Sequence, residues 1–277
     1  MLLDAKQVAG SLTKALDILY VLHGAKPAAR VLYDDDVELL TYLEKQGLHY
    51  ALSEFKIAVQ ADDTRSYTDK GVRVSVNAAG HHFLYVAKDK NVALQAMTLE
   101  KEGDHLAFGE LLGYPRCCCE FFHSAVQKSA SLDLTPATFA SSPGMVFPWQ
   151  LNTCLRGFDI SLISHFPCSF GCKQSLAIAE RNLELIRKME SDVATYFSHA
   201  LKSAVLYAQG VGVYSFPHFK LEGNVLQYLP QTAIVSMDNE LSEVIKKEKS
   251  LTILGRNAVK IGSTLVEDAQ TFFAIFS

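Results

Sequence analysis

The chain has 277 residues, enough for one large domain or two to three small ones, and nearly half of them are apolar. Its net charge of −4 does not indicate a nucleic acid or an anionic membrane as partner, because both usually require a basic face. It has no apolar run of about eighteen residues and no charged-then-apolar leader, so we predict no membrane helix and a cytoplasmic location, where thiols stay reduced. The sequence makes no prediction of the oligomeric state.

Residues 1–112 are predicted to form an α/β region. Apolar residues at helical spacing favour one helix over residues 7–23, and a second helix is expected up to Lys45. Asp34, Asp35 and Asp36 are predicted to cap that second helix rather than to bind a metal. Strands are expected at 28–33, 50–59, 72–76 and 82–87, of which the first two would form a β-α-β unit. A loop over 60–70 and a helix over 91–112, broken at Gly103, complete the region.

The rest of the chain changes character near residue 205. Residues 113–204 are predicted to be helical, with a helix up to Gln127, an irregular connection over 131–148 and one long helix from 173 to about 201. Residues 205–277 are predicted to be β-rich, with a hairpin turning at Gly223, strands at 251–254 and 271–275, and a helix over 239–249. The predicted fold class is therefore α+β, in three regions that span 1–112, 113–204 and 205–277.

All six cysteines lie between positions 117 and 172, in a central stretch about one fifth as long as the chain. Three are consecutive, Cys117 to Cys119, and Cys168 and Cys172 follow about fifty residues later, with Cys154 between the two groups. Clustered thiols in a reducing compartment are seldom purely structural, so this density predicts one metal site. The alternative is that free cysteines are buried and pack as small apolar side chains.

The position of the triplet suggests which thiols are ligands. Pro115 favours a helix start that places the triplet in the first turn, where free N–H groups and the helix dipole stabilise a thiolate. Successive helical residues point about 100° apart, so the three cannot all face one site. The sequence does not decide which of the three is excluded; Cys118 is favoured as the central ligand and Cys117 as the second, with Cys119 as the core residue.

The second cysteine segment supplies the remaining donors. Cys168 and Cys172 are four residues apart and can reach one ion, and His165 precedes Cys168 by three residues. Together with Cys117 or Cys118 they would complete a tetrahedral zinc site of the Cys₃His type. Alternatively, three thiolates would hold a 4Fe-4S cluster and leave one iron open to a substrate. The iron–sulfur cluster is favoured because thiols outnumber the single nearby histidine, with zinc as the alternative.

Two motifs resemble the paired signatures of a prokaryotic protein family of uncharacterised function. Its members carry an L-G-Y-P-x-C-C-x-x-F segment, which matches residues 112–121 here, and a downstream P-C-S-x-x-C segment, which matches residues 167–172. The resemblance covers about residues 105–180. It implies Cys117, Cys118, Cys168 and Cys172 as the shared set, leaves out Cys119 and Cys154, and brings no reaction with it.

The leading functional hypothesis is a metalloenzyme that acts on a small molecule by Lewis-acid or sulfur-transfer chemistry, as an iron–sulfur-dependent lyase or a sulfurtransferase. A structural zinc module is one alternative. A metal-free thiol redox protein is another, with a Cys168–Cys172 pair or with Cys118 as nucleophile. Arg156 and Asp159 are predicted either to bind an anionic substrate or to pair with each other.

Overall fold

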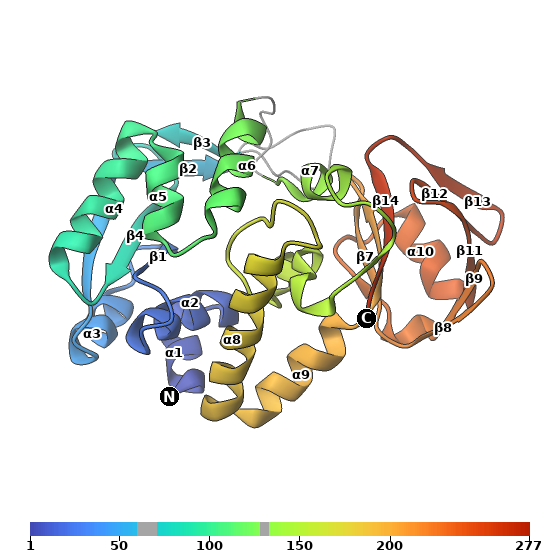
Figure 1. Ribbon diagram of the computed structural model, residues 1–277, viewed down its shortest axis with the longest axis horizontal. Helices are drawn as coiled ribbons and strands as arrows, with labels where there is room; N and C mark the ends of the chain where they lie inside the picture. Colours follow the sequence, from blue (N-terminus) through green and yellow to red (C-terminus); the bar gives the residue numbers. More distant parts are fainter. Residues whose placement is uncertain (60–70, 128–132) are drawn as a thin grey trace.

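The structure is a computed structural model that describes residues 1–59, 71–127 and 133–277 (Figure 1). The described residues form helices and three β-sheets, and all but one of the strand pairings are antiparallel, which confirms the predicted α+β class. The predicted loop over 60–70 lies outside the described residues. In the described ranges, no helix has the length and apolar character needed to cross a membrane.

The first sheet has the strand order β1-β4-β2-β3, and each neighbouring pair is antiparallel. Its strands are β1 (Ala28–Tyr33), β2 (His49–Val59), β3 (Gly71–Val74) and β4 (His81–Ala87). Because β1 and β2 both run opposite to β4, they are parallel to each other, as the predicted β-α-β unit requires. The helix between them is α3 (Val37–Lys45), and the Asp36 side chain caps it by accepting a hydrogen bond from the Glu38 N–H at 2.8 Å. The predicted role of Asp36 as a cap is confirmed.

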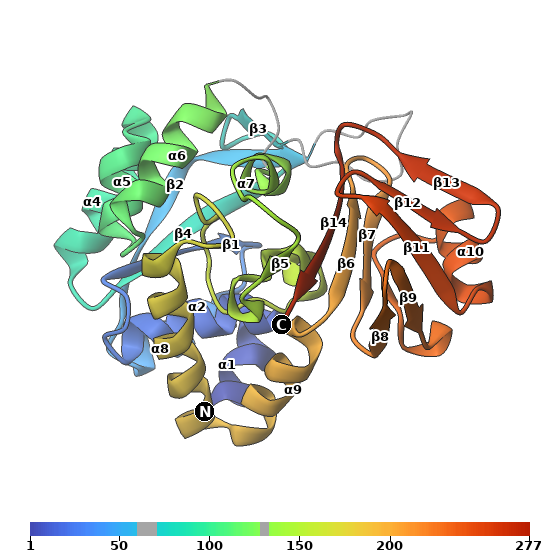
Figure 2. The ribbon, with the colours of Figure 1, turned by 45° about the vertical axis from the view of Figure 1, so that its right-hand side comes forward.

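Alternating side chains of this sheet enter two cores on its opposite faces. On one face, Tyr85 packs against Phe108 beneath α4 (Lys90–Glu102) and α5 (His105–Leu111). On the other face, Val31 and Leu84 join the largest core together with α1 (Leu2–Ala9) and α2 (Leu12–Leu22). Figures 1 and 2 show the two groups of helices on either side of the sheet.

The predicted single helix over residues 7–23 is wrong, because α1 ends at Ala9 and α2 begins at Leu12. Gly10 adopts a left-handed conformation with φ of 68°, which ends α1. Ser11 caps α2 by accepting a hydrogen bond from the Lys14 N–H. The turn lets both helices bury apolar side chains in the same core.

The central region contains more regular structure than predicted. Its elements are α6 (Arg116–Val126), α7 (Thr135–Ala140), β5 (Val146–Phe147), two 3₁₀ segments (Trp149–Leu151 and Thr153–Phe158), α8 (Lys173–Met189) and α9 (Ser191–Leu201). The short helix α7 lies in the stretch that was expected to be irregular. The predicted long helix is broken at Glu190, whose φ and ψ of −158° and 93° are extended. The apolar repeat of the predicted helix has no member between Ile186 and Val193, and Glu190 lies in that gap. A continuous helix would therefore bury no side chain of the repeat at this position.

The C-terminal region consists of two sheets and one helix. The first sheet runs β10-β7-β6-β14-β5 and the second runs β13-β12-β11-β9-β8. The elements are β6 (Ala204–Ala208), β7 (Gly212–Phe216), β8 (Phe219–Glu222), β9 (Val225–Tyr228), β10 (Ile234–Val235), α10 (Glu240–Lys247), β11 (Ser250–Gly255), β12 (Ala258–Ile261), β13 (Thr264–Glu267) and β14 (Thr271–Phe276), with a 3₁₀ turn at Pro230–Thr232. The predicted hairpin at Gly223 is present, but its first arm divides at Pro217 into β7 and β8, which belong to different sheets.

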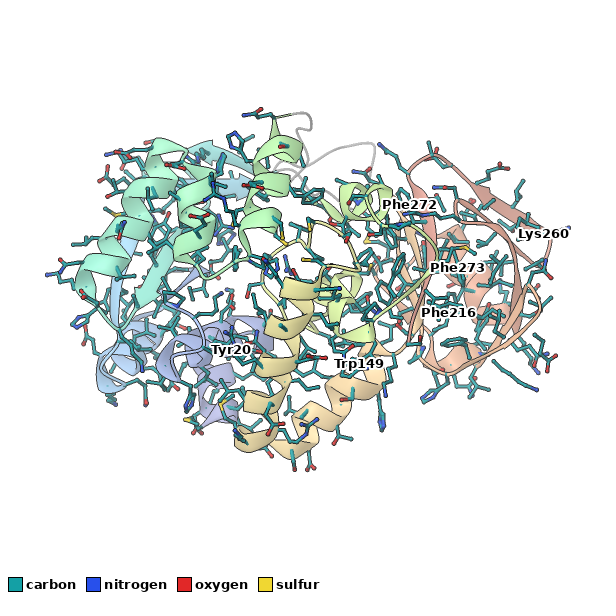
Figure 3. All side chains as sticks on the ribbon, in the orientation of Figure 1. Tyr20, Trp149, Phe216, Lys260, Phe272 and Phe273 are labelled. Atoms are coloured by element: carbon teal, nitrogen blue, oxygen red, sulfur yellow. The ribbon has the colours of Figure 1, made fainter. Side chains whose placement is uncertain are left out.

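The C-terminal strand β14 connects this region to the centre of the molecule. It pairs with β6 on one side and runs parallel to β5 on the other. Phe273 enters the core between the two C-terminal sheets, together with Phe216, whereas its neighbour Phe272 enters the main core and stacks on Phe139 (Figure 3). The sheet that contains β14 therefore has a buried core on each of its faces.

Asp159 connects the central region to the start of α2. Its carboxylate accepts hydrogen bonds from the Thr13 N–H at 2.8 Å and from the Ser11 hydroxyl at 2.6 Å, and the Leu12 N–H also donates to it. Burial acts to raise the pKa of Asp159, but these hydrogen bonds outweigh burial and hold the pKa below its usual range.

We predict that Asp159→Asn lowers the free energy of unfolding at pH 7 by about 1 kcal/mol. Asparagine keeps the shape and tolerates the left-handed φ of 64° at this position. A carboxyl whose folded pKa is lowered stabilises the fold above its unfolded pKa of about 3.9, and this contribution is lost as the pH falls through the folded value. Urea unfolding of both proteins from pH 7 downward should therefore show the difference shrinking in acid. The exposed Asp238, substituted in the same way, should leave stability nearly unchanged, and equal stability of D159N and the parent at pH 7 would contradict the prediction.

Candidate metal centre

Two helix N-termini meet at the cysteine motifs. Cys117 and Cys118 lie in the first turn of α6, just after the N-cap residue Pro115. Cys172 is the N-cap residue of α8, and Cys168 lies in the turn that precedes it. The structure therefore brings together two segments about fifty residues apart, as the sequence predicted. Both helices direct their positive ends toward the four sulfur atoms, an arrangement that stabilises negative charge on the cluster.

The four sulfur atoms form a compact set in which every pair lies within 4.8 Å. The Sγ atom of Cys172 is 3.8 Å from that of Cys117 and 3.7 Å from that of Cys118, and the Sγ atoms of Cys117 and Cys118 are 3.9 Å apart. A tetrahedral ion with metal–sulfur bonds of about 2.3 Å holds its sulfur ligands about 3.8 Å apart. The four thiols therefore have the donor chemistry and the spacing that could hold a single metal ion.

The other two cysteines lie elsewhere. Cys119 is buried on a different side of α6, with its Sγ 3.8 Å from the Tyr114 carbonyl oxygen. It packs against Gly109 of α5, where an added Cβ would come within 2.7 Å of the sulfur. Cys154 belongs to the main core. Both are apolar packing residues, as the sequence indicated.

His165 is not among the clustered donors. Its side chain is buried, and its Nε2 lies 2.8 Å from the hydroxyl oxygen of Ser175, which in turn lies 3.2 Å from Cys118 Sγ. Burial, together with the positive charges of Arg156 and Lys26, lowers the pKa of His165 to about 3, so the imidazole is neutral near pH 7. The structure thus places His165 one hydrogen bond beyond the thiols, where it orients Ser175.

Ser175 is the supporting residue whose position the sequence left open. It is fully buried in the first turn of α8 and lies between the imidazole of His165 and the sulfur of Cys118. The Cys168 backbone N–H also donates to Cys118 Sγ at 3.3 Å. Cys118 Sγ therefore has two hydrogen-bond partners besides the other sulfur atoms.

The buried thiols share negative charge unequally. The hydrogen bond between Cys118 and Cys172 and the burial of the pair raise the pKa of Cys118. The same hydrogen bond, supported by Ser175, lowers the pKa of Cys172 to about 4. Burial and the nearby charge of Cys172 raise the pKa of Cys168 to about 12. Without a cation the cluster thus favours one thiolate at Cys172, whereas a divalent ion would deprotonate its other ligands.

The surface of the cluster is not uniform. Cys118 and Cys172 are buried, whereas Cys117 and Cys168 are partly exposed. Cys117 Sγ also contacts the Gln174 side-chain oxygen at 3.7 Å. One edge of the set therefore faces solvent, and the opposite edge is enclosed by α6, α8 and Ser175.

Other polar residues singled out in the sequence have ordinary partners. His123 bonds to Gln127 with a separation of 2.9 Å, and His81 bonds to Asp34 at the surface. Arg156 and Asp159 do not pair with each other among the ion pairs of the described residues.

Comparisons with known proteins found no matching protein family, no similar curated protein and no similar solved structure. The resemblance to the prokaryotic family therefore remains a prediction that rests on the two cysteine motifs alone.

We predict that Ser175→Ala destabilises the protein by about 1–3 kcal/mol, because it leaves the buried His165 nitrogen without its partner. Urea unfolding at pH 7 would measure the change. Ser124→Ala is a matched control, since Ser124 is exposed on α6 and its loss should change stability by less than about 0.5 kcal/mol. Equal losses in the two variants would show that the Ser175 hydroxyl is not a structural partner of His165.

Proposed function

We propose that this chain is a zinc protein in which Cys117, Cys118, Cys168 and Cys172 hold one tetrahedral ion. The observation that carries the proposal is the sulfur spacing of 3.7–3.9 Å between Cys172, Cys117 and Cys118. A 4Fe-4S cluster distributes its thiolate ligands over separate iron ions and so needs them farther apart than the ligands of one ion. One zinc ion matches the spacing of these three sulfur atoms, and the Cys168 sulfur lies within 4.8 Å of each of them.

The proposed ion would cross-link two parts of the fold. Its ligands come from the start of α6, which packs on α5 of the first region, and from the turn that leads into α8. Four protein ligands leave no position for a substrate, which is typical of structural zinc sites. Metal binding would thereby stabilise the contact between α6 and α8.

An iron–sulfur enzyme is the second candidate, supported by the partial exposure of Cys117 and Cys168. Bound iron would supply Lewis-acid or sulfur-transfer chemistry at this solvent-facing edge. In that case the chain would be a lyase or a sulfurtransferase that acts on a small molecule, and the thiols would have to move apart around the cluster. A metal-free redox pair is a third possibility, which would form a reversible Cys168–Cys172 disulfide.

Elemental analysis of anaerobically purified protein separates these functions. We expect one zinc per chain, no acid-labile sulfide and no visible absorption, and cobalt substitution should produce the visible bands of a tetrahedral thiolate site. Iron with an equal amount of sulfide would favour the enzyme instead. Protein that contains neither metal, and whose four thiols react freely in the native state, would contradict both metal hypotheses.

Substitution of single cysteines should divide them into two groups. Cys118→Ser and Cys172→Ser should each weaken metal affinity at least tenfold and lower the thermal midpoint, because a thiolate ligand is lost. Cys119→Ala is the matched control, since it removes a neighbouring thiol that lies outside the cluster and should keep the metal stoichiometry. Loss of metal from C119A alone would contradict the ligand assignment.

A further inference from the structure

A cavity of about 260 Å³ lies between α2, β1 and the segment that leads to His165. It is separate from the clustered thiols. The exposed residues Arg30 and Leu32 mark the place where it reaches the surface. The polar side chains that matter for its chemistry are those of Lys14, Asp17, Tyr20, Arg30, Arg156 and Ser164.

Two of the charged groups at the cavity are already neutralised. Asp17 forms an ion pair with Lys26 at 2.9 Å and accepts a hydrogen bond from Ser164. Arg30 pairs with Glu100 at 2.5 Å. The nearby Asp159 is engaged by the N-terminal N–H groups of α2, which offset its charge. The carboxylates of Asp17, Glu100 and Asp159 therefore each have a cationic partner or N–H donors already.

Lys14 and Arg156 are the uncompensated cations. Neither takes part in an ion pair among the described residues, and each is only partly exposed. Nη2 of Arg156 donates to the carbonyl oxygens of Ile163 at 2.9 Å and His165 at 3.1 Å, which fixes the guanidinium without neutralising it. Burial lowers the pKa of Arg156, because the charged guanidinium has lost contact with water. A neighbouring anion would offset this desolvation cost.

The hydroxyl of Tyr20 is the second, independent sign of a ligand. The side chain is 2 % exposed and lines the cavity. Its oxygen is buried and has no hydrogen-bond partner within the described ranges. A buried hydroxyl is normally hydrogen-bonded, and a hydroxyl left without a partner in a cavity is ready to bond to a ligand.

We propose that this cavity binds a small molecule that carries a phosphate group. Two uncompensated cations match the two negative charges of a phosphate, and a guanidinium offers several N–H donors that suit its oxygens. Lys14 and Arg156 bind the phosphate oxygens, and the Tyr20 hydroxyl donates to one of them. The cavity is larger than one tetrahedral anion, so it also has room for a short organic body.

The test is calorimetric titration of the full chain in phosphate-free buffer at low ionic strength, with inorganic phosphate, ribose 5-phosphate and acetate as probes. We expect both phosphate probes to bind and acetate to bind much more weakly. Lys14→Gln and Arg156→Gln should each lower phosphate affinity about tenfold or more, since each removes a hydrogen bond to a charged group. Tyr20→Phe should lower the affinity severalfold without harming the fold.

Lys260→Gln is the matched control, because Lys260 is an exposed lysine on β12, far from Tyr20 (Figure 3), and it should bind phosphate like the parent chain. Ribose 5-phosphate that binds more tightly than phosphate assigns an organic phosphate ester, and equal affinities assign the free ion. If Arg156→Gln unfolds, Lys14→Gln and Tyr20→Phe decide the question. Absence of phosphate binding, binding that these variants leave unchanged, or acetate that binds equally well would overturn the proposal.

Discussion

The contact of four sulfur atoms at the start of two helices is the constraint on which the centre of the molecule depends. As neutral thiols they would pack like other small apolar groups. The two helix N-termini stabilise negative charge at the cluster. Without a cation that charge lies on Cys172, whose pKa is lowered to about 4, whereas the pKa of Cys118 is raised. Negative charge on neighbouring sulfurs is repulsive unless a cation lies among them. The surroundings of the cluster thus favour one thiolate, and further thiolates would need a cation to offset their mutual repulsion.

Several features outside the cluster keep the sulfurs in position. The absence of a side chain at Gly109 lets α5 lie close to α6. A Cβ atom at this position would come within 2.7 Å of the Cys119 sulfur. His165 holds Ser175 from the buried side and packs its ring against Tyr114, with the ring centroids 4.9 Å apart. The first region thus touches the motif through α5, and the central region touches it through α8. The cysteines lie at the boundary between these two parts of the chain.

Local patterns predicted much of the fold, and contacts between distant segments account for most of the errors. A short apolar run identified β1 and capping residues such as Asp36 identified α3, because these signals lie within or next to the elements themselves. The break between α1 and α2 was also encoded locally, in Gly10 and Ser11, but the apolar repeat beyond them concealed it. The pairing of β14 with β5 joins residues more than a hundred positions apart, and neither strand carries a sign of its partner.

The candidate site shows the same division. Thiol density predicted a site, and helical geometry showed that Cys117, Cys118 and Cys119 could not all be its ligands, because the first turn of a helix has a known shape. The resemblance of the two motifs was what set Cys119 aside. His165 stood at chelating distance in the sequence, yet its ring lies against Ser175, and only the three-dimensional path of the turn determines that. The cation pair at the cavity depends in the same way on the fold, since Lys14 and Arg156 come from segments that the sequence does not connect.

The two sites share one stretch of chain, and this sharing limits how independently they can behave. Arg156 binds the carbonyl oxygen of His165, and Cys168 follows three residues later. An anion at Arg156 and an ion at Cys168 would therefore both restrain the segment between them. If both proposed ligands bind, the first would remove part of the conformational freedom that the second would otherwise have to remove. Any resulting coupling must be reciprocal, so a phosphate compound that tightens metal binding is itself bound more tightly by the metal-loaded chain.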